Sequence, residues 1–206
     1  MNGWAKFHYI ATWVFNVAYL NLLWILFSII GLVFFGLFPA TAAMFAIVRK
    51  WVILDERDFN IFTTFWFFYR KDFLKLNGFA LFFFIIGYFI YFNISFLVLN
   101  PNSFHFLYPG TIIFTLAYAM TLLYFFPVFV HFKLSFFQYI KQAFLLAVIS
   151  PLEVIAILLV AVILFAFIVW IPGMIPLFSG SVLSICILYL SRRSFRRLTQ
   201  KTGENQ

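Results

Sequence analysis

Residues 10–48 read IATWVFNVAYLNLLWILFSIIGLVFFGLFPATAAMFAIV, and none of them is charged. An α-helix needs about 20 apolar residues to cross the hydrocarbon core of a bilayer. Four further apolar stretches follow, at about 79–99, 111–130, 144–170 and 174–190. The chain is therefore predicted to be all-α, a polytopic transmembrane helix bundle.

The composition excludes an ordinary soluble protein. Hydrophobic residues make up 66% of the chain and charged residues 10%, whereas soluble domains carry about 25% charged residues. The length of 206 residues suits one transmembrane domain over 1–206, without a separate soluble domain. The net charge of +8 does not indicate a nucleic-acid partner, because the basic residues flank the apolar segments, where they face lipid headgroups and set orientation.

The positions of these basic residues predict the orientation in the membrane. All Lys and Arg residues except Lys6 lie in three segments: 39–76, 132–150 and the C-terminal tail. Positive residues stay on the cytoplasmic side, so five crossings would place the C-terminus inside and the N-terminus outside. The five expected crossings are about 15–38, 77–99, 111–131, 151–170 and 174–190.

The first crossing has an alternative. Thirty-odd uncharged residues are long for one helix, and Gly31, Gly36 and Pro39 could mark a turn. Residues 40–54 would then re-enter the membrane as a sixth crossing. In that case the N-terminus lies inside, and Lys6 also obeys the charge rule.

The start of the fourth crossing reads Ser150-Pro151-Leu152-Glu153. Ser at the N-cap, Pro at the first helical position and an acid at the third are typical of a capping box. We expect Ser150 and Glu153 to form this structural cap. Glu153 as an intramembrane ion or proton site is the alternative.

The segment 59–75 places aromatic residues three or four apart and basic residues between them, which predicts an amphipathic helix in the interfacial plane. It either seals the base of the bundle or docks on another membrane protein. An Arg-rich tail continues the last crossing and is expected to anchor it to lipid. The candidate partner- or lipid-contacting residues here are Phe62, Phe65, Trp66, Tyr69, Arg70, Lys71, Phe73, Lys75, Arg192, Arg193, Arg196 and Arg197.

No pattern indicates catalysis, a cofactor or a metal. His8, His105 and His131 lie in different segments, and Cys186 has no His nearby in the sequence. A metal site needs about three or four convergent ligands, and no Gly-rich phosphate loop of the GxxxxGK(S/T) form is present. We expect neither an enzyme nor a cofactor.

Two stretches resemble the YesL-like family of bacterial membrane proteins of unknown function. One is GLFPATAA at 36–43, followed by Arg49, Lys50 and Trp51, which join the candidate contact residues; the other is 62–77. The resemblance implies a protein of the bacterial cytoplasmic membrane. It also implies an association, because family members are often encoded beside permease and binding-protein genes of carbohydrate importers of the ATP-binding-cassette type.

The expected function is therefore a non-catalytic accessory or regulatory subunit that contacts lipid and the permease subunits of such an importer. The alternative is an autonomous small-solute transporter or channel that acts as an oligomer. That alternative predicts a polar path lined by residues such as Asn16, Asn93 and Thr115.

Overall fold

The computed structural model describes residues 3–100, 104–171, 173 and 175–203. Within these ranges the chain is helical and contains no strand, which confirms the all-α prediction. The elements are α1 (Gly3–Ile30), α2 (Leu37–Val52), α3 (Ile61–Lys71), α4 (Phe73–Leu99), a 3₁₀ turn (His105–Leu107), α5 (Tyr108–His131), α6 (Phe136–Ile149), α7 (Pro151–Trp170) and α8 (Ile175–Gly203).

Among the residues that the structure describes, four helices, α1, α4, α5 and α7, are long and apolar enough to cross a bilayer. Shorter apolar helices lie at Phe136–Ile149 and, within α8, at Leu177–Arg192. These helices make the chain a multi-pass membrane protein.

The single crossing expected at 15–38 is wrong. Helix α1 ends at Ile30, and Leu32 and Val33 adopt left-handed φ values of 57° and 63°. Gly31 and Gly36 then lie so close that a Cβ on Gly31 would collide with the backbone of Gly36. The glycine pair lets the chain reverse here, so the turn considered as the alternative is present and α2 runs back beside α1.

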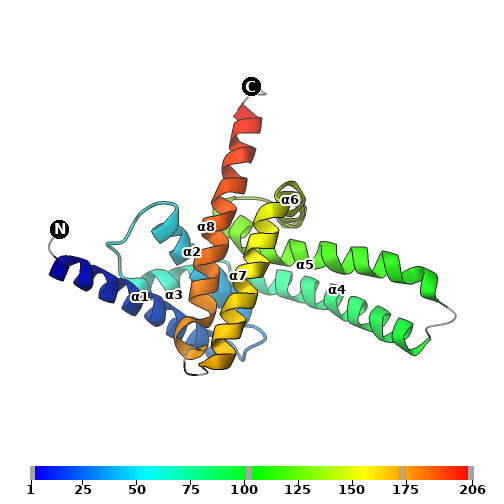
Figure 1. Cartoon of the computed structure of the whole chain (residues 1–206), viewed down its shortest axis with the longest axis horizontal. Coiled ribbons are helices and arrows are strands. Elements are labelled where there is room, and N and C mark those ends of the chain that lie inside the picture. The colour runs from blue at the N-terminus through cyan, green and yellow to red at the C-terminus, as the bar shows by residue number, and fades with distance from the viewer. Residues whose placement is uncertain (1–2, 101–103, 172, 174, 204–206) are drawn as a thin grey trace.

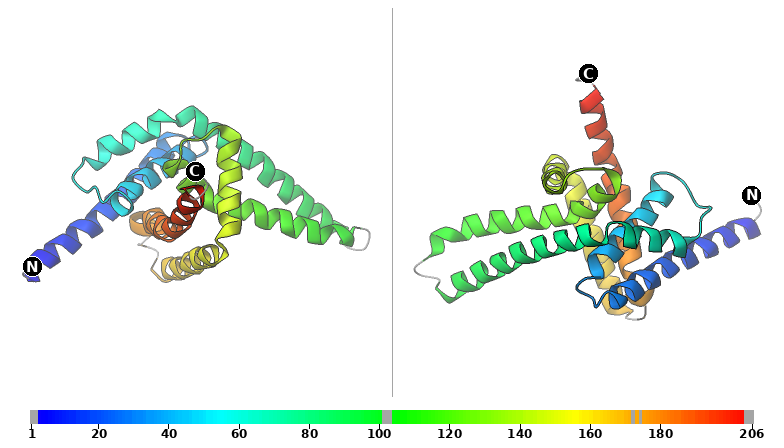
Figure 2. Two further views of the ribbon diagram at one scale, coloured as in Figure 1. Left: turned by 90° about the horizontal axis from the view of Figure 1, so that it is seen from above. Right: turned by 180° about the vertical axis from the view of Figure 1, so that it is seen from behind.

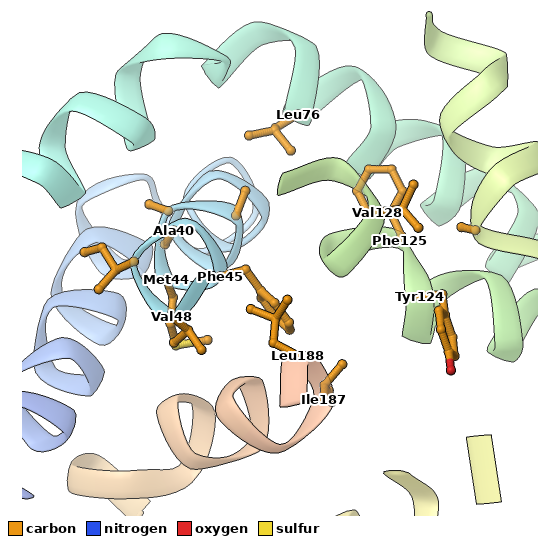
Figure 3. Close-up of a cluster of buried hydrophobic side chains, with 14 of the residues drawn as sticks. Ala40, Met44, Phe45, Val48, Leu76, Tyr124, Phe125, Val128, Ile187 and Leu188 are labelled. Atoms are coloured by element: carbon orange, nitrogen blue, oxygen red, sulfur yellow. The ribbon is translucent and has the colours of Figure 1, made fainter. Parts of the chain in front are cut away.

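Helix α2 is the centre of the fold. It contacts α1, α3, α4, α5 and α8, and its residues from Pro39 to Val48, except Thr41, are buried. Small side chains such as Ala40 and Ala43 let these neighbours approach closely. Figure 3 shows Phe45 of α2 beside Leu188 of α8.

Two pairs of helices leave this core in different directions. Helices α4 and α5 extend side by side away from the core, while α7 and α8 pack together along another direction (Figure 1). The views from above and behind show α1 extending on the side opposite to the tip of the α4–α5 pair (Figure 2). Much of the surface of the outer helices is therefore not covered by the chain itself.

Single residues join the short helices to the long ones. Asp72 (φ −117°, ψ 24°) separates α3 from α4, and Ser150 (φ −123°, ψ 60°) separates α6 from α7. The single helix expected over 59–75 is thus wrong. Helix α3 ends at Lys71, and Phe73 and Lys75 belong to the first turn of α4. The break at Asp72 lets α3 pack on α1 while α4 turns away.

Candidate functional site

The aromatic face of α3 packs against Phe27 of α1. The ring centres of Phe65, Trp66 and Tyr69 lie 5.2, 5.5 and 5.1 Å from that of Phe27. The Tyr69 hydroxyl donates a hydrogen bond of 3.3 Å to the Phe27 carbonyl. Phe65 and Tyr69 are buried, and burial raises the pKa of the Tyr69 hydroxyl above its ordinary value. These two rings belong to the core and are not available to a partner.

Other side chains of α3 remain exposed, including two that border Phe27. Phe62 and Trp66 are exposed, and the Arg70 guanidinium lies 5.2 Å from the centre of the Trp66 ring. The Lys71 ammonium lies 5.7 Å from the exposed Phe67 ring. These side chains keep the amphipathic character expected from the sequence.

A basic cleft of about 650 Å³ opens where the end of α2, the α3–α4 junction, the end of α5 and α6 meet. It is lined by Ala42, Ala46, Arg49, Lys50, Leu54, Phe68, Lys71, Asp72, Lys75, Leu76, Phe129, Val130, His131, Phe132, Lys133, Leu134 and Tyr139. Lys or Arg residues thus come from four separate parts of the chain. We call this site the basic cleft.

The charges of the basic cleft are poorly balanced. Asp72 is the acid among its lining residues, against five Lys and Arg side chains. Lys50 pairs with Glu56 at 2.6 Å, outside the lining. In the part of the chain that the structure describes, Lys71, Lys75 and Lys133 form no ion pair. The cleft therefore carries a net positive charge.

Arg49 lies deepest in this charge arrangement. Its Nε is buried and has no hydrogen-bond partner among the described residues. Burial lowers the pKa of Arg49 below its ordinary value, and the Glu56 carboxylate opposes this shift. Arg49 also lines the basic cleft, where its guanidinium adds a positive charge.

Lys75 is held against aromatic rings. Its ammonium lies 4.6 Å from the ring centre of Tyr139 and 5.6 Å from that of Phe129. It sits in the first turn of α4, where the helix dipole disfavours a cation. By contrast, Arg49 and Lys71 lie in the last turns of α2 and α3, where the dipole favours them.

The remaining expected contact residues fall elsewhere. Trp51 is buried in the core cluster. Arg192 on α8 is half-buried, and the side chains of Arg193, Arg196 and Arg197 lie outside the described part of the structure. The Arg-rich segment continues the helix of the last apolar stretch, because α8 extends to Gly203.

The capping box expected at 150–153 is wrong. Ser150 does stand at the N-cap position before Pro151, but its side chain makes no capping hydrogen bond. It is also the residue after α6, with its N–H donating to the Leu146 carbonyl at 3.1 Å. Because Ser150 both follows α6 and precedes α7, its ψ is 60°, far from the extended value typical of an N-cap. Glu153 is buried in the first turn of α7.

Sequence reasoning missed the capping box that does form. Ser135 has an extended backbone, and its N–H donates to Gln138 Oε1 at 3.0 Å. The Ser-x-x-Gln spacing at 135–138 was a usable signal. It also missed Asp72, His131, Lys133 and Tyr139 as lining residues of the basic cleft, for which no local pattern exists.

The polar residues named for the transporter alternative have the following surroundings in the described structure. Thr111 Oγ1 donates to Asn93 Oδ1 at 2.8 Å, between α5 and α4. Thr115 instead donates to the Thr111 carbonyl of its own helix. The hollow that contains Asn93 and Thr111 is lined by neither Thr115 nor Asn16.

Taken together, these features define a polytopic, all-α membrane protein with a buried central helix and a basic cleft at one end of it. Residues 17–94 match the family described as "Protein of unknown function, DUF624". The chain belongs to the YesL-like family of bacterial membrane proteins.

Three relatives from Bacillus subtilis (strain 168) cover most of the chain. Uncharacterized protein YteU is 34% identical over 94% of this chain and 87% of its own length. Uncharacterized protein YesV is 32% identical over 89% and 88%, and uncharacterized protein YesL is 31% identical over 94% and 91%. No solved structure matches the chain.

Proposed function

We propose that the chain is a non-catalytic accessory or regulatory subunit that binds the permease subunits of a carbohydrate importer of the ATP-binding-cassette type. The observation that carries this proposal is the sparse internal packing of α4 and α7. Only 17% of the most apolar window of each helix is buried within the chain. Both helices therefore offer long faces to other membrane-embedded helices.

A protein partner explains α4 better than lipid alone. Tyr88 lies near the middle of α4 and is 60% exposed. Its hydroxyl has no hydrogen-bond partner in the described part of the chain. A polar group in the hydrocarbon region is costly unless it is hydrogen-bonded. An acceptor on a neighbouring permease helix would satisfy the Tyr88 hydroxyl, which lipid tails cannot do.

We also propose that both termini are cytoplasmic. The Arg57 guanidinium lies 5.4 Å from the centre of the Tyr9 ring, so the first half of α1 lies on the same side as the basic segment 49–57. The positive-inside rule places that segment in the cytoplasm. In a Cys186→Ser background, a cysteine introduced at Ala5 should react with a membrane-impermeant maleimide only after lysis. Labelling of intact cells would contradict this orientation.

A photo-crosslinking amino acid at Tyr88 tests the partner directly. In native membranes it should yield adducts with the permease subunits, identified by mass spectrometry after purification in mild detergent. The matched control is the same substitution at Phe83, a buried residue of α4, which should give only adducts within the chain. Adducts with other copies of the chain would favour the oligomeric transporter, and adducts with lipid alone would overturn the accessory function.

A further inference from the structure

Helix dipoles and ion pairs within the described chain do not account for all the positive charges of the basic cleft. Helix dipoles account for Arg49, Lys50 and Lys71, because these residues lie in the last turns of α2 and α3. They do not account for Lys75, which stands at the unfavourable end of α4. Nor do ion pairs account for Lys71, Lys75 and Lys133, as described above.

The donors of the basic cleft converge on one space. Arg49 lines this space from the last turn of α2, together with Lys71, Lys75 and Lys133. Lys75 is fixed by the Tyr139 and Phe129 rings, so its ammonium loses little freedom when it binds an acceptor. Guanidinium and ammonium groups are the usual partners of phosphate oxygens in proteins.

The size and walls of the basic cleft also fit a ligand. Its volume of about 650 Å³ lies in the range of about 300–1,000 Å³ that is typical of small-molecule sites. Phe68, Phe129 and Leu134 form apolar parts of the wall beside the cations. The cleft can therefore hold a charged group together with an adjoining apolar or polyol portion.

We propose that the basic cleft binds a phosphate ester, with Arg49 and Lys75 as its principal donors and Lys71 and Lys133 at its rim. The phosphate belongs either to a phospholipid headgroup or to a soluble phosphate ester. Both sources present the same anionic oxygens to the same donors. The inference concerns a ligand of this chain alone and does not depend on the accessory function.

Two assays separate the two sources. In the first, the protein is reconstituted in nanodiscs of phosphatidylcholine with a minority of phosphatidylglycerol, and native mass spectrometry counts the retained phosphatidylglycerol. In the second, glycerol 1-phosphate is titrated calorimetrically into protein in a neutral detergent, with glycerol as the uncharged reference. Retention in the first assay identifies a lipid headgroup, and binding in the second identifies a soluble ester.

The decisive variant is Arg49→Gln with Lys75→Gln. We expect its affinity in the responding assay to fall about tenfold or more, because hydrogen bonds to charged groups are the strong ones. The matched control is Lys6→Gln with Lys141→Gln, which makes the same charge change at exposed positions outside the cleft. This control should bind as the unmodified protein does.

A further variant keeps the test usable if Arg49→Gln disturbs α2. Lys71 and Lys133 are exposed at the rim, so Lys71→Gln with Lys133→Gln should leave the fold intact and weaken binding several-fold. The proposal is overturned if neither probe binds the unmodified protein, or if the cleft variants bind as well as it does. It is also overturned if the Lys6 and Lys141 control loses as much affinity as the cleft variants, because binding would then reflect net charge alone.

Discussion

Replacing Gly36 by Ala should destabilise the protein, because this glycine lies against the end of α1. A Cβ at Gly36 would stand 2.5 Å from the Ser28 carbonyl oxygen and 2.7 Å from that of Phe27, whereas ordinary contacts begin at 3.4 Å. Both oxygens are backbone atoms that accept hydrogen bonds from the turn, from Val33 N–H and Gly31 N–H. They cannot move aside as a flexible side chain could.

The cost follows from that geometry. Forcing an extra methyl group into a well-packed site costs about 1–3 kcal/mol, and occasionally more. We expect Gly36→Ala to lower the free energy of unfolding by about this amount. The change should be measured by denaturant or thermal unfolding of the purified protein, in one detergent for all variants.

The matched control is Gly110→Ala in the first turns of α5. A Cβ there meets nothing within 4 Å, and Ala is roughly 0.5–1 kcal/mol more favourable than Gly within a helix. This variant should be as stable as the unmodified protein, or slightly more stable. If Gly36→Ala is equally stable, the close reversal at 31–36 is refuted and a straight helix through this segment becomes the better description.

Three further substitutions, at two positions, test the contacts of α1. Asn21→Ala should cost about 1–3 kcal/mol in the same unfolding assay, because the buried Asn21 Oδ1 accepts hydrogen bonds of 2.9 and 3.0 Å from the backbone N–H groups of Gly180 and Ser181; an unchanged stability would contradict this α1–α8 contact. Tyr69→Phe removes only the hydroxyl and should cost about 0.5–1.5 kcal/mol, whereas Tyr69→Ala should cost about 3–5 kcal/mol; equal losses would contradict the packing on Phe27. Burial raises the pKa of the Tyr69 hydroxyl. The contribution of the protonated hydroxyl to stability is therefore complete below the ordinary pKa of 10 and is lost as pH rises through the raised pKa. Tyr69→Phe should reduce this alkaline loss of stability, and an identical pH profile would exclude the contribution.

The helical class and the long apolar helices could be predicted because they depend on length and apolar composition alone. The reversal at 31–36 was only an alternative, for a physical reason. Leu32 and Val33 adopt left-handed backbone there, and nothing in a run of Leu, Val and Phe indicates such a conformation. Gly31, Gly36 and Pro39 gave the usable signal, and glycine and proline are also common in transmembrane helices.

The candidate sites were less predictable, since they depend on contacts between distant segments. The aromatic face of α3 was recognisable, but its burial depends on Phe27 of α1, which no local pattern identifies. The capping box predicted at Ser150 does not form because this one residue ends α6 and begins α7. That constraint is visible only in the backbone angles. The basic cleft joins Arg49 of α2, Lys75 of α4 and Lys133 of the α5–α6 connection, and their convergence is a property of the fold alone.

The contact of Asn21 with Gly180 and Ser181 has a consequence for biosynthesis. The partners are separated by 159 and 160 residues, and α2 also packs on α8, which follows the other described helices along the chain. The α1–α2 pair must therefore remain in the translocon or the bilayer without its α8 contacts until α8 has been synthesised. The core can close only after α8 has been synthesised, so assembly depends on α8 more than the early apolar segments suggest.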